Sequence, residues 1–353
     1  MRKIYSFCLS LLICVLPQAT RAEATPVESY IPPERIELRL HYPAIDLQNG
    51  NEGWVEAHMM VSPEGKVYEP VIIDSSGGAG FERAAIRALK KGKFKPASLH
   101  GEPIDAGMRL KLTYRLKNKS QTVSREFHRD ITEFIASIGN GDVEAAGKYR
   151  EQLLLRGAKN LFEDAWLNFA MANYYQASND KEGQYRHLKR AVAYESKESF
   201  LPASLFQSAL VSMFALNVER SDFAAALATW KMLEPRLQDN DLKARLNNLV
   251  HEVRTAIEGD SAIRVKGQID QGYGWAMKLV RSEFFVEPSE GRISELKLRC
   301  EKQYIGFPWR PDIAFRVPKA YGACVLQGIG DRAAEFTAVQ MPEACGESGP
   351  ERP

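Results

Sequence analysis

The sequence predicts an α+β protein of several domains: a small α+β domain, an all-helical middle and a small antiparallel β domain. Three observations support this fold class. Apolar and polar residues alternate with a period of two in parts of residues 36–118. Residues 124–259 carry proline at two positions and show apolar residues at helical spacing. From Ile263 onward, short strand-like runs are separated by Gly and Pro turns.

Length and charge limit the classes of protein. The chain has 353 residues, and its 47 Lys and Arg against 45 Asp and Glu give a formal net charge of +2. A single core rarely grows beyond about 250–300 residues, so two or three domains are expected. The balanced charge provides no global field for a polyanion, and no aromatic residues are interleaved with the basic ones as in RNA-recognition modules. The sequence therefore predicts no nucleic-acid partner.

Residues 1–22 have the order of a secretory signal peptide. Basic residues precede the apolar run Ile4–Leu16, and small residues follow up to Ala22. We expect cleavage after Ala22, export to the periplasm and an extended leader over residues 23–35. If the run is not cleaved, residues 4–16 would instead anchor the chain in the inner membrane, although a spanning helix needs about 18–20 residues.

Residues 36–118 predict strands around a single helix. Gly53–Val61 and Val67–Ile73 alternate on either side of a turn. A Gly-rich stretch then opens a helix over Phe81–Lys91, and because it lacks the nucleotide-binding motifs it is interpreted as a turn and helix entry. Residues 108–117 alternate most clearly, which predicts a half-buried antiparallel strand with a basic outer face.

A set of short motifs follows in order along these residues: Tyr42, Pro43, Gly53, Gly65, Phe94 and Pro96. In this order and spacing, residues 36–118 resemble the C-terminal domain of the TonB family. The resemblance implies a three-stranded antiparallel sheet with one helix packed on it. It also implies an edge strand that binds an extended peptide from an outer-membrane receptor. The outward residues of that strand would be Arg109, Lys111, Thr113, Arg115 and Lys117.

The middle of the chain predicts three helical pairs and a last helix, at residues 125–156, 162–195, 204–236 and 239–258. The spacing of Trp166, Ala170 and Tyr175 resembles degenerate tetratricopeptide (TPR) repeats, and a plain helical bundle is the alternative. A repeat array would offer a concave surface to protein partners.

Residues 262–341 predict a small antiparallel β domain, and residues 342–353 a disordered tail without an apolar anchor. Cys8 and Cys14 would leave with the signal peptide. Two of the remaining cysteines would pair in an oxidising compartment, and the sequence leaves open which two. These candidates are Cys300, Cys324 and Cys345.

The sequence predicts no catalytic residues, no metal site and no cofactor. Its six histidines are dispersed without zinc spacing, and no nucleophile motif is present. An envelope enzyme housed in residues 262–341 stays an alternative. Between Phe81 and Leu116, nine basic residues face three acidic ones, which suits either an acidic or anionic partner or a solvated, aggregation-resistant face.

Two functions follow from these expectations. The preferred one is a non-enzymatic, exported envelope protein that binds an extended peptide or receptor segment by β-strand addition, with the helical repeats as a partner scaffold. The alternative is an inner-membrane energy transducer of the TonB type that supports receptor-mediated transport. The identity of the partner and the oligomeric state do not follow from the sequence.

Overall fold

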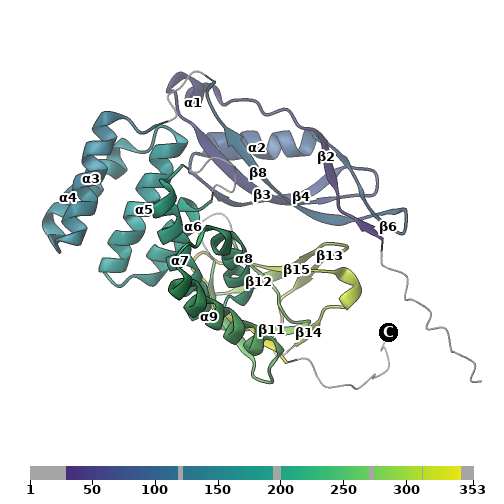
Figure 1. Ribbon diagram of the computed structural model, residues 1–353. Helices are drawn as coiled ribbons and strands as arrows, with labels where there is room; N and C mark the ends of the chain where they lie inside the picture. Colours follow the sequence, from purple (N-terminus) through teal and green to yellow (C-terminus); the bar gives the residue numbers. More distant parts are fainter. Residues whose placement is uncertain (1–28, 118–121, 194–199, 270–273, 312, 343–353) are drawn as a thin grey trace, which may run out of the picture.

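A computed structural model describes residues 29–117, 122–193, 200–269, 274–311 and 313–342 (Figure 1). In chain order it contains an N-terminal α+β region (29–117), a helical region (122–258) and a C-terminal β region (263–341). In Figure 1 the helical region lies beside the other two, whose sheets face each other. The predicted α+β fold class is confirmed. The expected signal peptide and most of the tail lie outside the described residues.

The main sheet of the N-terminal region is antiparallel, with the strand order β4-β3-β8. Its strands are β3 (Gly53–Val61), β4 (Val67–Ser75) and β8 (Ala106–Tyr114). Helix α2 (Ala79–Lys91) covers one face and packs Phe81 and Leu89 against the apolar residues of that face. The opposite face of β3 is also largely buried, because the other two regions pack on it. The alternation in β8 predicts a sheet with one face in solvent, whereas in the structure part of that outer face is covered.

Short elements complete this region. Helix α1 (Ala44–Gln48) precedes β3. Part of the expected leader is paired with distant residues instead of running alone, because β1 pairs with β6 and β2 with β5. The short strands are β1 (Tyr30–Ile31), β2 (Glu34–Glu37), β5 (Lys93–Lys95), β6 (Ala97–Leu99) and β7 (Glu102–Ile104).

Several helices of the helical region begin at residues whose side chains cap the first turn. Side chains of Ser124, Asp142 and Asn160 accept hydrogen bonds from main-chain N–H groups in the first turns of their helices. In the described part of the chain, no helix is long and apolar enough to cross a bilayer. The helices are α3 (Arg125–Gly139), α4 (Val143–Arg156), α5 (Leu161–Ala177), α6 (Lys181–Ala191), α7 (Ala203–Glu219), α8 (Phe223–Leu233), the 3-10 turn η1 (Glu234–Arg236) and α9 (Asn240–Glu258).

The C-terminal region contains two four-stranded antiparallel sheets around one apolar core, in the orders β10-β15-β12-β13 and β14-β11-β16-β9. Cys300 on β12 lies directly opposite Cys324 on β15, and the two form a disulfide. Cys345 lies outside the described residues. The elements are β9 (Ile263–Gln268), β10 (Trp275–Lys278), β11 (Glu283–Glu290), β12 (Ile293–Cys300), β13 (Tyr304–Pro308), β14 (Phe315–Arg316), the 3-10 turn η2 (Lys319–Tyr321), β15 (Cys324–Gly330) and β16 (Glu335–Met341).

Removing this disulfide should lower the free energy of unfolding by about 3 kcal/mol, because the bond restricts the unfolded chain. The cross-link joins residues 24 positions apart. Urea denaturation of a Cys300→Ser/Cys324→Ser double variant checks this against oxidised wild type, with reduced wild type as the matched control. A double variant as stable as the oxidised protein would contradict the prediction.

The three regions are joined by specific contacts of the β3–β4 face. The Trp54 indole donates a hydrogen bond to Asp164 of α5 at 3.1 Å, and its ring belongs to the apolar core of the helices. Asp74 of β4 pairs with Lys189 and Arg190 of α6, at 3.3 and 3.2 Å. The helices therefore hold the N-terminal sheet through the face of β3 and the end of β4.

Candidate functional site

The candidate site is the outer edge of β8, where a further strand could pair. Trp54 directs both its main-chain groups toward β4, because its N–H donates to Ser76 Oγ at 2.9 Å and its C=O accepts from Ser76 N at 3.0 Å. The residue opposite Trp54 on β8 is Thr113. In an antiparallel ladder, two residues that lie opposite each other either exchange both main-chain hydrogen bonds or exchange none. Because the N–H and C=O of Trp54 point to β4, Trp54 and Thr113 exchange none, and the N–H and C=O of Thr113 point away from β3.

The β3–β8 register is continuous, so this orientation repeats at every second residue of β8. Arg109 and Lys111 therefore also direct their main-chain groups away from β3. We call the outward main-chain groups of Arg109, Lys111 and Thr113 the β8 edge. All of these groups lie on the side of β8 that faces away from β3.

The opposite edge of the sheet, on β4, is obstructed. Pro70 lies within β4 and has no N–H to donate. The neighbouring Glu69 C=O accepts a hydrogen bond from the Arg299 guanidinium of β12 at 2.9 Å, and the Glu69 carboxylate lies 2.8 Å from Lys297 Nζ. A strand added there would have to displace the C-terminal region. The C-terminal region therefore covers this part of the β4 edge.

Of the five expected site residues, three have side chains that contact other side chains of this protein, and the other two are exposed. Arg109 is 56% exposed and forms an ion pair with Glu56 of β3. Lys111 Nζ lies 5.0 Å from the centre of the Trp54 ring, and the Arg115 guanidinium lies 5.9 Å from that of Phe200. Thr113 is exposed, and Lys117 is exposed beyond the end of β8.

Several cations act on the Glu56 carboxyl of β3, which lies opposite Lys111 of β8. Burial alone would raise the pKa of the Glu56 carboxyl, yet Arg109, Lys111 and Lys189 outweigh burial and hold that pKa below its usual range. The neighbouring His58 is buried, and desolvation together with Arg299 and Arg109 lowers its pKa to about 3. The His58 imidazole is therefore neutral at physiological pH and adds no positive charge beside Arg299 and Arg109.

The six motif residues serve the fold of this region. The Tyr42 hydroxyl donates to Asn51 O, and its ring packs edge-on against Phe81 and Tyr114, with centres 5.8 Å apart in each pair. Gly65 has a φ of +75°, and a Cβ there would lie 2.2 Å from the Phe94 carbonyl oxygen. The other motif residues are also packed: a Cβ on Gly53 would meet the Phe81 ring, Pro96 lies near Gly65, and Pro43 precedes α1.

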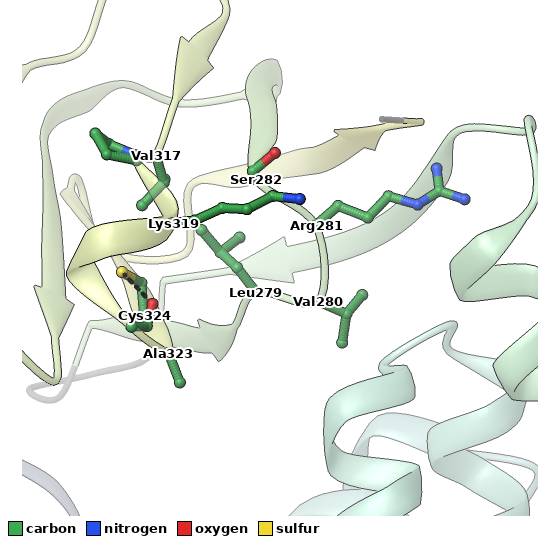
Figure 2. Close-up of a pocket in the computed structure, with 10 residues that line it drawn as sticks. Leu279, Val280, Arg281, Ser282, Val317, Lys319, Ala323 and Cys324 are labelled. Atoms are coloured by element: carbon green, nitrogen blue, oxygen red, sulfur yellow. Dashed lines mark hydrogen bonds between the residues drawn. The ribbon is translucent and has the colours of Figure 1, made fainter. Parts of the chain in front are cut away.

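The described residues contain no group of three His, Cys, Asp or Glu side chains arranged to hold a metal ion. A pocket of about 220 Å³ lies beside the disulfide in the C-terminal region (Figure 2). Its lining includes Lys319 and Arg281, and Figure 2 shows Arg281 extending toward the neighbouring helices. There its guanidinium donates to main-chain carbonyls at the end of α9. The described residues that line this pocket include no carboxylate and no histidine.

Sequence reasoning predicted a strand over residues 108–117, which corresponds to β8, but missed what covers the β4 edge and what lies on the outer face. Pro70 inside an apparent strand was the one local signal that β4 is an edge unsuited to pairing. The contact of Arg299 with Glu69 joins residues 230 positions apart, and no local pattern indicates it.

Comparison with known proteins supports the expected resemblance for this region. Residues 39–116 match the model of the Gram-negative bacterial TonB protein C-terminal family. Protein TonB of Vibrio cholerae is 26% identical over 81 residues, which are 23% of this chain and 33% of the relative. The chain thus matches about a third of that relative's length. The solution NMR structure of the Pseudomonas aeruginosa TonB C-terminal domain covers 25% of this chain and 91% of its own, at 17% identity and a TM-score of 0.23. Residues 39–116 therefore carry a TonB-type C-terminal domain, which the helices and the C-terminal β region follow in this chain.

Proposed function

We propose that this chain is a non-enzymatic envelope protein whose TonB-type domain captures an extended segment of another protein by strand addition at β8. The observation that carries the proposal is the asymmetry of the sheet edges. The main-chain groups of Arg109, Lys111 and Thr113 point away from β3, whereas Pro70 and the Arg299 contact obstruct β4. Main-chain hydrogen bonds would supply affinity, and neighbouring side chains would supply selectivity. The partner class that suits this mode is a receptor of the outer membrane with an extended periplasmic segment.

In this proposal the helices form TPR-like pairs that position the TonB-type domain. Consecutive helices pack together as α3 with α4, α5 with α6 and α7 with α8, and α9 follows. The contacts of Trp54 and Asp74 fix the sheet against α5 and α6. The domain boundaries expected at residues 36–118, 124–259 and 262–341 are part of the same proposal. A second partner would then bind the helices away from the sheet.

A second candidate function rests on the apolar run Ile4–Leu16. If it is retained, the same strand-capturing domain would be tethered to the inner membrane as an energy transducer. Intact mass measured after osmotic-shock fractionation separates the two. A periplasmic chain beginning near Glu23 supports the exported protein, and an uncleaved chain in the membrane fraction supports the transducer.

Replacing Thr113 with proline should weaken peptide capture at least tenfold while leaving the fold intact. Proline removes an N–H that points away from β3, so the β3–β8 ladder loses no hydrogen bond. The measurement selects binders to wild type from a displayed library of random nine-residue peptides, then compares their affinities for Thr113→Pro. The matched control is Thr113→Ala, which removes the side chain and keeps the N–H. Selected peptides that bind Thr113→Pro as tightly as wild type would rule out capture at this edge.

A further inference from the structure

Resting on the proposed function, in which the helices bind a second partner, we propose that this partner presents a carboxylate to a cluster of side chains on α4, α5 and α6. The three helices lie next to one another in Figure 1, and α5 packs against both of its neighbours. The cluster consists of Arg150 on α4, Tyr174 and Tyr175 on α5, and Arg186 and His187 on α6. We call these five residues the helical cluster.

Arg150 is a half-buried cation without an ion pair in the described part of the chain. Its guanidinium lies 5.4 Å from the centre of the Tyr174 ring, and one Nη donates a long hydrogen bond of 3.5 Å to the Tyr175 hydroxyl. Its Nε is buried and has no hydrogen-bond partner among the described residues. The residues three and four positions away on α4 are alanine, glycine and leucine, so no acid faces Arg150 from its own helix. A cation partly removed from water in this way favours the binding of an anion beside it.

Tyr175 connects Arg150 to α6. Its ring stacks on the His187 imidazole, with ring centres 5.2 Å apart and the planes at 13°. Gly183 makes room for this stack, because a Cβ there would lie 2.5 Å from the Tyr175 ring. Arg186 and His187 come three and four residues after Gly183, so both neighbour it on the surface of α6. Since Arg186 is exposed, its charge lies beside the stack at the protein surface.

Two arginines supply the positive charge of the helical cluster. Burial first, and then the charges of Arg190, Arg186 and Arg150, lower the pKa of the His187 imidazole to about 4. The imidazole is therefore neutral at physiological pH. Arg190 already pairs with Asp74 of β4 at 3.2 Å. Arg150 and Arg186 have no ion pair within the described residues, so their charges are the ones that an incoming carboxylate would meet.

The acids near the helical cluster have other partners. Asp180 caps α6, because its carboxylate accepts a 2.8 Å hydrogen bond from Gly183 N, and it opposes the effect of the arginines on His187. Glu182, one turn before Arg186, pairs with Arg220 of α7. These carboxylates therefore serve the helix start and the contact with α7.

A carboxylate of a protein segment is the anion that suits this geometry. A guanidinium can donate two parallel hydrogen bonds to a carboxylate. The Tyr175 hydroxyl accepts from Arg150 and keeps its own O–H to donate. Tyr174 is fixed beside Arg150, because its ring packs against the buried Phe134 of α3 with centres 5.9 Å apart. The half-buried tyrosine rings would cover apolar atoms of the segment next to the carboxylate, which a free inorganic anion does not offer.

The test uses the full chain and the same library of random nine-residue peptides. Clones selected on wild type are measured against Thr113→Pro, which reports on β8, and against Arg150→Gln, which reports on the helical cluster. We expect one group of clones to keep its affinity for Thr113→Pro, to bind Arg150→Gln at least about tenfold more weakly and to share an Asp or Glu. Replacing that acid by its amide in the peptide should cost the same factor on wild type and nothing further on Arg150→Gln, because both changes remove one interaction.

Two further variants keep the test decisive if Arg150→Gln folds poorly, which its denaturation midpoint by circular dichroism reveals. Arg186→Gln, at an exposed position, and Tyr175→Phe, which keeps the stacked ring, should each weaken the same clones about threefold. Arg245→Gln, at an exposed position of α9, removes the same charge and should leave their affinity unchanged.

The other outcomes separate this proposal from strand addition. A selection in which every clone is lost on Thr113→Pro and kept on Arg150→Gln would overturn the helical cluster as a binding site and leave strand addition standing. Clones lost on Arg150→Gln without a shared acid would overturn the carboxylate. Phosphatidylglycerol vesicles that bind wild type and not Arg150→Gln, with no peptide selected, would overturn the protein partner in favour of lipid headgroups. Acidic clones at the helical cluster with none at β8 would support the cluster and contradict strand addition.

Discussion

Replacing Trp54 with alanine should lower the free energy of unfolding by about 3–5 kcal/mol, the usual cost of emptying a large buried aromatic site. Trp54 is 1% exposed and extends from β3 into the apolar core of the helices. Its indole N–H is bonded to Asp164, and Lys111 lies over its ring. The substitution would therefore leave a cavity and also remove one hydrogen bond to Asp164 between two regions of the chain.

Chemical denaturation of Trp54→Ala, followed by circular dichroism, gives the loss directly. Limited proteolysis should in addition release the helical region from the TonB-type domain more readily than in wild type. The matched variant is Trp54→Phe, which keeps most of the buried ring and removes the N–H, and it should cost clearly less. A loss below about 1 kcal/mol for Trp54→Ala would contradict its role as the anchor between sheet and helices.

Replacing Arg281 with methionine should destabilise the C-terminal region by at least about 3 kcal/mol, because several buried carbonyl acceptors would lose a charged donor at once. Arg281 is 5% exposed. Its guanidinium donates to five main-chain oxygens at 2.6–3.3 Å, which belong to Ala256, Ile257, Gly259, Ser261 and Gln340. The first two are among the last carbonyls of α9, which have no partner within the helix.

Arg281→Lys is the informative comparison, since one ammonium keeps the charge and cannot reach five oxygens in the same plane. It should lie between wild type and Arg281→Met in the denaturation midpoint. Arg292→Met, on the exposed surface of the same region, is the control and should change stability by less than about 0.5 kcal/mol. Equal midpoints for Arg281→Met and Arg292→Met would show that the carbonyl contacts of Arg281 contribute nothing.

Much of the fold could be predicted because its main elements are encoded by short-range patterns. The alternation over Gly53–Val61 corresponds to β3, and the helical spacing from Phe81 corresponds to α2, which begins two residues earlier. These patterns report which side chains share a face, and burial of that face stabilises the element. The two- to four-residue strands β1, β2, β5, β6 and β7 went unnoticed. β1 and β2 pair with distant residues, and β6 and β7 form a hairpin whose strands are too short to show an alternation.

The cysteine pairing likewise could not be predicted from local patterns. Three candidates allowed three pairings, and spacing along the chain did not choose among them. Cys300 and Cys324 pair because β12 and β15 are neighbours in the sheet and their register places the two residues opposite each other. That register is a tertiary property, since it depends on how the two sheets enclose their core.

The sequence by itself predicted the order of the main strands and helices and a TonB-like domain over residues 36–118, of which residues 39–116 match the family model. The choice of β8 as the partner-binding strand is implied by the family resemblance and stays a prediction. The tertiary structure decided that the outer face of β3 is occupied by the protein's own helices and that Arg299 obstructs β4. It also decided which main-chain groups of β8 point outward. The physical reason is that periodicity along a chain specifies the direction of side chains. What lies against a face or covers the β4 edge depends on contacts between residues more than a hundred positions apart.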